Sequence, residues 1–224
     1  MLNDLKRQVC KANKDLASSG VVRFTWGNVS GFDSSMGLFV IKPSGVPYED
    51  LQPELMVVMS LEGQKVEGRL KPSVDSDIHR AIYVSWPFSI SGIAHTHSTY
   101  AVAFAQAGLS IPALGTSHAD YFGGPIPITR AVDKSEINEN YGRNLGSLIV
   151  ATAAQPEHVP AVLVDHHGPF TWGKSPSEAV QNAVVLEEIA HAAYLSRMLN
   201  PKCEGLGEDQ MNFHHQRRLD GYGQ

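Results

Sequence analysis

Two histidines one residue apart, His95 and His97, are the residues whose type and spacing point most directly to chemistry. They follow the apolar residues Gly92-Ile93-Ala94, a pattern that predicts a short strand. Because side chains alternate along a strand, residues two apart lie on the same side, so both imidazoles would face one spot. Imidazoles bind zinc and neighbouring transition metals, and a metal held in this way is a Lewis acid for a carbonyl group.

Further ligands for such a metal would come from other parts of the chain. Either His166 or His167, in the stretch His166-His167-Gly168-Pro169, could supply the third imidazole. Asp75 lies at the start of a predicted helix, where it is a candidate carboxylate ligand or, equally, a plain helix cap. A short H-x-H motif also occurs as a pair of buried, hydrogen-bonded histidines, so the metal site is a hypothesis that the rest of the chain must support.

Small polar residues in three predicted turns are typical of an anion site. Glycines allow backbone N–H groups to approach an anion closely, and hydroxyl groups and a lysine would complete the cradle. The same residue types are also ordinary turn formers, which is the alternative for each turn taken singly. Three such turns together favour a phosphate, and their residues are Gly27, Asn28, Ser44, Gly45 and Ser73, with Lys42 nearby.

Candidate proton carriers occur in two places. Asp120 and Tyr121 follow His118 in a Gly-rich segment, residues 115–127, that we expect to form loops. Tyr222 stands near the C-terminus, after a cluster that contains His214, His215, Arg217 and Arg218. A polar tail of this kind is either solvated or folds over a site and supplies an acid or a base.

The elements that would position these residues alternate between helices and strands. Helices are predicted over residues 2–18, 76–86 and 99–107, after Asp133, and from Ser175-Pro176 onward, and strands over 21–26, 38–41, 56–60, 92–97, 160–164 and 170–172. Residues 27–30 are predicted as a polar turn. The mixture of hairpins and helices predicts an α/β fold with a mostly antiparallel sheet flanked by helices. A Rossmann fold is disfavoured, since no G-x-G-x-x-G follows the first strand.

The composition excludes several classes of function. The chain has 224 residues, enough for one large domain, and its net charge of −5 does not favour binding to nucleic acid or to anionic membranes. No apolar run approaches the roughly 20 residues that span a bilayer. The first ten residues carry charges where a signal peptide is apolar, and the two cysteines, Cys10 and Cys203, form no disulfide framework. We therefore expect a cytoplasmic protein.

Seven sequence blocks, in order, carry a resemblance to a known family. They are TWGNVS (25–30), IKPSGV (41–46), KPSxD (71–75), HTHS (95–98), HADYF (118–122), HGPFxWGK (167–174) and YGQ (222–224). Together they resemble the L-ribulose-5-phosphate 4-epimerases of the class II aldolase/adducin-like family over essentially the whole chain. The resemblance implies a three-layer α/β/α fold with a single domain over residues 1–224. It also implies a homotetramer with active sites at subunit interfaces, in which the tail (about 201–224) reaches a neighbouring subunit.

The resemblance also implies roles for individual residues. Asp75, His95, His97 and His167 would hold one Zn²⁺ per subunit, with Mn²⁺ or Co²⁺ as alternatives. Asp120 and, from a neighbouring subunit, Tyr222 would be the catalytic acid and base. The substrate-binding residues would be Gly27, Asn28, Lys42, Ser44, Gly45, Ser73, Val74, His214 and Arg217. The loop between the tail helix and Tyr222 is a few residues short of the family pattern, so His215 and Arg218 are the alternatives to the last two. Val74 stands where the family commonly has a second serine, and Gly142 replaces a common acidic residue.

The implied function is a metal-dependent epimerase that acts on a sugar phosphate. It would interconvert L-ribulose 5-phosphate and D-xylulose 5-phosphate by retro-aldol cleavage and aldol re-addition at C4, in arabinose, ascorbate or other pentose catabolism. One alternative is a class II aldolase that cleaves a related ketose 1- or 5-phosphate, although family aldolases use a Glu near the position of Asp75. A second alternative is a non-catalytic, adducin-like scaffold, against which all four ligand positions argue.

Overall fold

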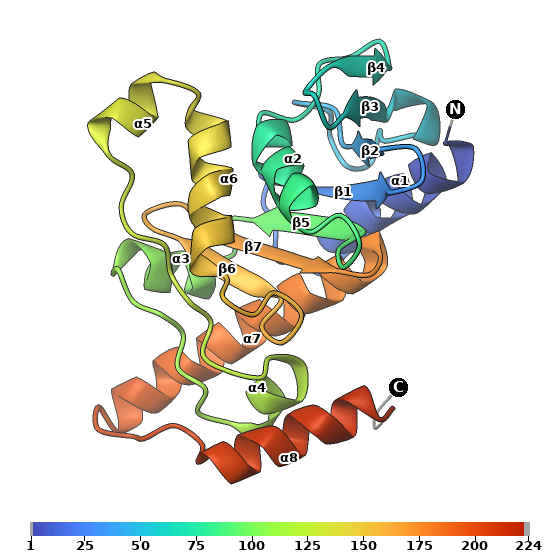
Figure 1. The fold of residues 1–224 in the computed structure, drawn as a ribbon. Helices are drawn as coiled ribbons and strands as arrows, with labels where there is room; N and C mark the ends of the chain where they lie inside the picture. Colours follow the sequence, from blue (N-terminus) through green and yellow to red (C-terminus); the bar gives the residue numbers. More distant parts are fainter. Residues whose placement is uncertain (1, 222–224) are drawn as a thin grey trace.

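The computed structural model describes residues 2–221 and shows an antiparallel sheet between two layers of helices (Figure 1). The seven strands of this part of the chain lie in the order β4-β3-β2-β1-β5-β7-β6, and each neighbouring pair is antiparallel. The predicted α/β fold with a flanked antiparallel sheet is therefore confirmed. The strands are β1 (Gly27–Asp33), β2 (Leu38–Ile41), β3 (Val57–Ser60), β4 (Lys65–Glu67), β5 (Gly92–Thr96), β6 (Ala161–Val164) and β7 (Gly168–Gly173).

Helices cover both faces of the sheet. On one face lie α1 (Asn3–Ser18) and the long α7 (Pro176–Leu199), and on the other lie α2 (Ser76–Ser85) and α6 (Tyr141–Thr152) (Figure 1). The remaining helices are α3 (Thr99–Gln106), α4 (Thr116–Tyr121), α5 (Lys134–Asn138), α8 (Glu208–Leu219) and the 3₁₀ turn η1 (Pro53–Leu55). α8 packs on α4, and both lie below α7 in the view of Figure 1.

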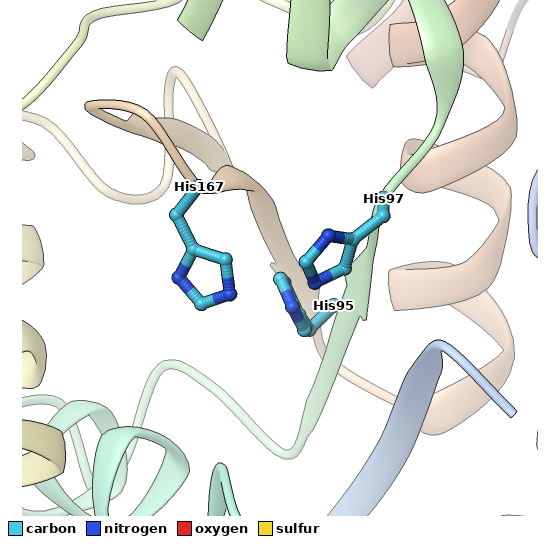
Figure 2. Close-up of side chains that lie close together, drawn as sticks. All are labelled: His95, His97 and His167. Carbon is cyan, nitrogen blue, oxygen red and sulfur yellow. The ribbon is translucent and has the colours of Figure 1, made fainter. Parts of the chain in front are cut away.

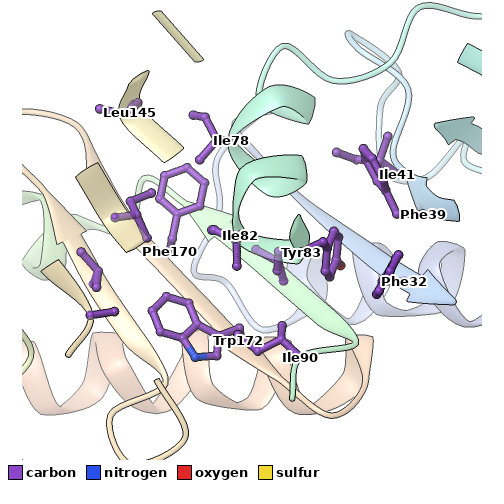
Figure 3. Packing of buried hydrophobic residues seen from close by; sticks show 14 of the residues in the cluster. Phe32, Phe39, Ile41, Ile78, Ile82, Tyr83, Ile90, Leu145, Phe170 and Trp172 are labelled. Atoms are coloured by element: carbon purple, nitrogen blue, oxygen red, sulfur yellow. The ribbon is translucent and has the colours of Figure 1, made fainter. Parts of the chain in front are cut away.

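Alternation along the strands divides the core between the two faces. In β2, Phe39 and Ile41 pack under α2, whereas Val40 between them packs under α1. Figure 3 shows the first of these cores, in which Tyr83 of α2 stacks on Phe32 of β1 with ring centroids 4.9 Å apart. The burial of apolar area, at about 25 cal/mol per Å², stabilises the packing of α2 against the sheet. Because α2 begins directly after Asp75, this packing also fixes the position of Asp75.

The five predicted helices are all present, and two of them begin with side-chain caps. Ser175 caps α7 by accepting the N–H of Glu178, with Pro176 at the first helical position. Asp133 begins α5 with a capping box that includes Glu136. The helix over 141–152 was not predicted. Its residue Gly146 fits closely against Ala81 of α2.

The predicted strand over 21–26 and turn over 27–30 are both wrong, because β1 itself begins at Gly27. Its sequence is rich in Gly and polar residues, but these are satisfied by tertiary contacts that a local pattern does not reveal. A Cβ atom on Gly31 would lie 2.8 Å from Leu5 Cδ1, so only glycine lets α1 approach this closely. The hydroxyl of Ser30 is hydrogen-bonded to His79 and Tyr83.

The segment predicted to form loops, residues 115–127, and the polar tail are both partly helical. α4 lies within the segment 115–127 and carries Asp120, and α8 lies within the polar tail. Met211 of α8 is buried against Ala113 and Ala119, so this part of the tail is packed and not simply solvated. Tyr222, the second predicted catalytic residue, lies outside the described residues.

Candidate metal centre and substrate pocket

Three imidazoles converge at one end of the neighbouring strands β5 and β7, in the interior of the sheet. His95 and His97 come from the end of β5, and His167 comes from the turn that precedes β7 (Figure 2). One ring nitrogen from each residue lies within 4.8 Å of the others, and the ring centroids are 4.7 to 5.0 Å apart. This is the only such group of His, Cys, Asp or Glu side chains among residues 2–221. The sequence-predicted convergence of two strand histidines with one from the second cluster is present.

The surroundings of His95 leave one of its nitrogens free for a ligand. Its Nδ1 lies 2.9 Å from the carbonyl oxygen of Pro169, and a carbonyl only accepts, so Nδ1 carries the proton. The Nε2 atom is therefore a buried lone pair, and it has no hydrogen-bond partner. The ring stacks on Phe170, with centroids 4.2 Å apart. A buried acceptor without a partner is costly, and a bound cation would remove that cost, so this donor set fits a metal ion.

The imidazoles are in the protonation state that a metal needs. Burial lowers the pKa of His95 to about 3, although Asp75 acts in the opposite direction. Burial also lowers the pKa of His97 and of His167. All three rings are thus neutral at pH 7 and offer lone pairs.

The choice between His166 and His167 is made by the turn between β6 and β7. His166 has a positive φ of 55° and its side chain is 71% exposed, 3.6 Å from Asp165. The backbone N–H of His167 donates a hydrogen bond to the carbonyl of Val164, 3.0 Å away. The ring of His167 faces the other two imidazoles. The local backbone therefore sends one histidine to solvent and the next one inward.

Asp75 precedes α2 at the cap position, but its side chain does not cap the helix. One carboxylate oxygen instead accepts a hydrogen bond from the Asn28 amide at 2.7 Å. Burial raises the pKa of Asp75, but the nearby rings of His95 and His79 and the bond from Asn28 outweigh it, so the net pKa lies below its ordinary value. Asp75 lies beside the imidazoles, outside the tight group that they form.

A pocket of ≈ 480 Å³ opens next to the imidazoles. Its walls include His97, His167 and Asp75 together with the predicted phosphate-binding residues Gly27, Asn28, Lys42, Ser44, Gly45, Ser73 and Val74. Two loops are joined here, because the N–H of Ser73 donates to the Lys42 carbonyl and that of Ser44 to the Lys71 carbonyl, each at 3.0 Å. The structure thus brings the metal and phosphate candidates to one cavity. Trp26, half-exposed beside His97, also lines it and was not predicted.

Lys42 makes contacts that the sequence did not indicate. Its side chain is buried, and Nζ donates to the carbonyls of Val46 at 2.7 Å and Pro43 at 3.3 Å. The ammonium also lies over the ring of Tyr48, 4.9 Å from the centroid. Burial lowers the pKa of Lys42 to about 8. Within one chain, Lys42 therefore closes the loop that carries Ser44 and Gly45.

Asp120 is held by two side chains of α8. Its Oδ1 lies 3.2 Å from Nδ1 of His214 and 3.1 Å from Nε of Arg217. The alternatives point elsewhere, since His215 packs against His158 and Arg218 lies over the ring of Tyr121. Of the two pairings considered for the tail, His214 and Arg217 are the ones that contact Asp120.

Asp120 does not line the imidazole pocket of its own chain. It lines a second, polar pocket of ≈ 720 Å³ between α4, α8 and the start of α7, together with Tyr121, Glu178 and Arg218. The metal candidates and the candidate acid/base of one chain therefore occupy different cavities.

The sequence is similar to known proteins over nearly the whole chain. Residues 7–194 match the family described as Class II Aldolase and Adducin N-terminal domain. The chain is 49% identical over 219 residues to "L-ribulose-5-phosphate 4-epimerase UlaF" of Salmonella paratyphi B, covering 97% of this chain and 96% of that protein. The protein of the same name from Salmonella typhi is equally similar.

Solved structures of related enzymes share the fold. An L-fuculose 1-phosphate aldolase superimposes with a TM-score of 0.81 at 24% identity, covering 96% of this chain and 95% of the other. The L-fuculose-1-phosphate aldolase of Thermus thermophilus gives a TM-score of 0.71 at 25% identity, covering 90% and 99%. Within residues 2–221, no helix has the length and apolar character needed to cross a membrane.

Proposed function

The chain belongs to the class II aldolase and adducin family, and we propose that it is a metal-dependent L-ribulose-5-phosphate 4-epimerase. It would invert C4 and so interconvert L-ribulose 5-phosphate and D-xylulose 5-phosphate. The observation that carries this proposal is the convergence of three neutral imidazoles, of which His97 and His167 line a cavity together with the two joined loops around Ser44 and Ser73. The near-complete match to curated epimerases at 49% identity selects this reaction within the family.

His95, His97 and His167, with Asp75, are the proposed ligands of one Zn²⁺ per subunit, with Mn²⁺ or Co²⁺ as alternatives. When bound, the cation would supply Lewis acidity to the substrate oxygens that gain negative charge as the C3–C4 bond breaks. Three neutral nitrogens and one carboxylate leave the centre with a net positive charge, which suits an anionic fragment.

The phosphate would bind between the two loops of the cavity. Backbone N–H groups around Gly45, which has a positive φ of 72°, and the hydroxyls of Ser44 and Ser73 are the donors. Asn28 lies beside this anchor, where its amide nitrogen donates to Ser73 and Asp75 and its buried, unpartnered Oδ1 would accept a hydrogen bond from a hydroxyl group of the sugar. This anchor would keep the aldehyde fragment in the site while its carbonyl group rotates to present its other face.

Two groups on opposite sides of C4 would move the proton of its hydroxyl. One group removes this proton as the C3–C4 bond breaks, which leaves an enediolate and an aldehyde. After the aldehyde rotates, the enediolate attacks its other face, the C3–C4 bond re-forms, and the second group returns a proton to the new alkoxide. We assign these roles to Asp120 and Tyr222. The hydrogen bonds from His214 and Arg217 support a carboxylate form for Asp120.

We propose that the site is completed by a neighbouring subunit in a homotetramer, with the segment 201–224 at the interface. The support is that Asp120 lines a different cavity from His97 and His167 of the same chain. The phosphorylated substrate and two free cysteines, Cys10 and Cys203, support a cytoplasmic location.

A subunit-mixing experiment tests the shared site. His97→Asn should remove the metal and Asp120→Asn the acid/base, so each variant alone should be inactive. If Asp120 serves the metal centre of a neighbour, oligomers re-formed from an equal mixture should regain about a quarter of wild-type activity. Demonstrated subunit exchange without any recovery would contradict a site built from two chains.

The reaction itself is tested by product analysis. Purified protein with Zn²⁺ and L-ribulose 5-phosphate should form D-xylulose 5-phosphate, detected by a coupled assay. Free aldehyde, measured in parallel, should stay at background, because the fragment is held until it recombines. Sustained aldehyde release without xylulose 5-phosphate would replace the epimerase by an aldolase, and inactivity at full metal occupancy would favour a scaffold.

A further inference from the structure

Tyr48 is a buried tyrosine that contacts two residues of the proposed substrate cavity, Gly27 and Lys42. It is 6% exposed, and its hydroxyl donates to the carbonyl oxygen of Gly27 at 2.8 Å. The ammonium of Lys42 lies over its ring, 4.9 Å from the centroid. Burial raises the pKa of Tyr48, so the hydroxyl keeps its proton at neutral pH and remains a donor. One side chain thus joins the start of β1 to the loop that follows β2.

The start of β1 needs such a partner because it extends past the end of β2. β1 pairs with β5 from Gly27 onward, whereas its pairing with β2 begins only at Ser30. Where β2 is absent, side chains supply the hydrogen bonds. The Asn13 side chain is bonded to both the N–H and the carbonyl of Val29, at 2.9 and 3.0 Å, and Tyr48 satisfies the buried carbonyl of Gly27. Buried backbone groups without partners are costly, so these two side chains determine the path of β1 here.

Gly27 has little room on the side of β5. Its φ is 118°, and a Cβ atom on it would lie 2.8 Å from the carbonyl oxygen of His95 and 3.4 Å from the hydroxyl of Tyr48. Gly27 is therefore packed between β5 and Tyr48. The space that the hydroxyl fills is the direction in which the start of β1 could move if the hydroxyl were lost.

The contacts of Tyr48 also close a ring of interactions around the cavity. Asn28 donates its amide to the hydroxyl of Ser73 at 3.0 Å. The N–H of Ser73 donates to the carbonyl of Lys42, also at 3.0 Å. The ammonium of Lys42 lies over Tyr48, and the hydroxyl of Tyr48 returns to Gly27, the neighbour of Asn28. The other four members of this ring line the cavity, and Tyr48 completes it from outside.

We propose that Tyr48 is a positioning residue, which holds the start of β1 against the loop of residues 42–46 and so sets the spacing between two walls of the phosphate site. The inference rests on the sugar-phosphate function proposed above and adds no donor to the substrate. A site whose walls already have the spacing of the bound state loses less freedom when its ligand binds, so it binds more tightly. Without the hydroxyl the ring would be open at Gly27, and the phosphate would have to hold the two walls in place.

Tyr48→Phe tests this role, because it removes the hydroxyl and keeps the ring beneath Lys42. In the zinc-loaded protein, the KM for L-ribulose 5-phosphate and the Ki of inorganic phosphate should both rise about 10-fold, the equivalent of one hydrogen bond. The value of kcat should stay within about threefold of wild type, since the groups at the metal and at C4 are unchanged. As a measurement independent of turnover, inorganic phosphate should raise the thermal unfolding midpoint of the wild type more than that of the variant.

Thr171→Val is the matched control for a general loss of stability. The buried hydroxyl of Thr171 donates to the carbonyl of Ala179 at 2.8 Å, and neither residue lines the cavity. This variant should unfold at a lower temperature but keep the wild-type KM and Ki. Tyr48→Leu also removes the ring beneath Lys42 and should weaken phosphate binding at least as much as Tyr48→Phe.

The outcomes separate this inference from the function beneath it. If inorganic phosphate neither inhibits nor stabilises the wild type, the proposed phosphate site fails, and the role of Tyr48 fails with it. If the wild type binds phosphate and the folded Tyr48→Phe variant binds it equally well, the role of Tyr48 alone is overturned. An equal loss of phosphate affinity in Thr171→Val would overturn it as well.

Hydrogen exchange of the wild type provides the test if Tyr48→Phe does not fold. Inorganic phosphate should slow exchange in peptides that cover residues 26–30 and 42–48 together, because Tyr48 links the two segments. Protection of the second segment without the first would contradict this link.

Discussion

Arg217 on α8 donates its Nε to Oδ1 of Asp120 on α4, at 3.1 Å, and its terminal nitrogen donates to the second oxygen at 3.3 Å. Burial raises the pKa of Asp120, but the hydrogen bonds from Arg217 and His214 outweigh it, so the net pKa is below its ordinary value. The C-terminal helix therefore keeps Asp120 ionised, which suits a group that removes a proton first. The link also makes the chemistry of α4 depend on a segment nearly 100 residues away.

Replacing Arg217 by Ala should move the acidic limb of the pH profile of kcat/KM to higher pH. The guanidinium lowers the pKa of Asp120, so its loss lets that pKa rise, and Asp120 becomes protonated, and inactive as a base, at a higher pH. Arg218→Ala is the matched control, since Arg218 lies over Tyr121. An unmoved limb in Arg217→Ala would mean that another group controls it.

The zinc content of two variants should distinguish the role of the imidazoles, as metal ligands, from that of Asp120. His97→Asn removes one of three converging nitrogens, and we expect less than about a tenth of the wild-type zinc to survive dialysis. Asp120→Asn should keep its zinc and lose about 10²- to 10⁴-fold in kcat. Elemental analysis and steady-state kinetics on the same preparations provide the comparison. Full zinc occupancy in His97→Asn would show that the ligand set is wrong.

Lys42 should give the protein a stability that rises with pH in the alkaline range. Its pKa is about 8 in the folded protein and 10.5 ordinarily, so between these values the unfolded chain binds more protons. The free energy of unfolding then increases with pH, by up to about 1.4 kcal/mol per unit, and the gain is complete above the ordinary pKa.

Lys42→Met lacks this contribution. The free energy of unfolding of the wild type minus that of the variant therefore isolates it. Urea unfolding of both proteins at about pH 7 and about pH 9.5 should show the difference moving in favour of the wild type. A difference independent of pH would indicate that Lys42 titrates normally in the folded state.

Gly146 should be intolerant of a side chain. A Cβ atom there would lie 2.5 Å from the Cβ of Ala81 and 3.1 Å from the carbonyl oxygen of Ile78, so α6 would have to move away from α2. We expect Gly146→Ala to cost about 1–3 kcal/mol, against the usual preference for Ala within a helix. Gly207 has a φ of −62° and open space around it, so Gly207→Ala should be nearly neutral. Thermal unfolding of both variants and the wild type provides the measurement.

Local pattern was sufficient where one element decided the outcome. The H-x-H motif at the end of an apolar strand placed His95 and His97 on one side, because alternation is a property of the strand itself. The capped start of α7 at Ser175-Pro176 was predictable because the cap depends only on neighbouring residues. The sequence blocks shared with the family favoured His167 over His166 as the third imidazole, a choice that no local rule makes.

Contacts between distant segments decided the remainder. β1 is a strand despite its Gly-rich, polar sequence, because Ser30 finds buried partners on α2 and Gly31 admits α1. His167 points inward and His166 outward because of a turn fixed by the pairing of β6 with β7. Asp75 faces Asn28 instead of capping its helix, across 47 residues.

By itself the sequence determined the residue types, their spacing along each strand and helix, and hence which imidazoles could share a face. Only the tertiary structure decided that His97 and His167 share a cavity with Ser44 and Ser73, and that Asp120 lines a different cavity together with residues of α8. The physical reason is that spacing controls direction within one element. The distance between elements is set by packing and by the pairing of buried polar groups, and both depend on residues far apart in the chain.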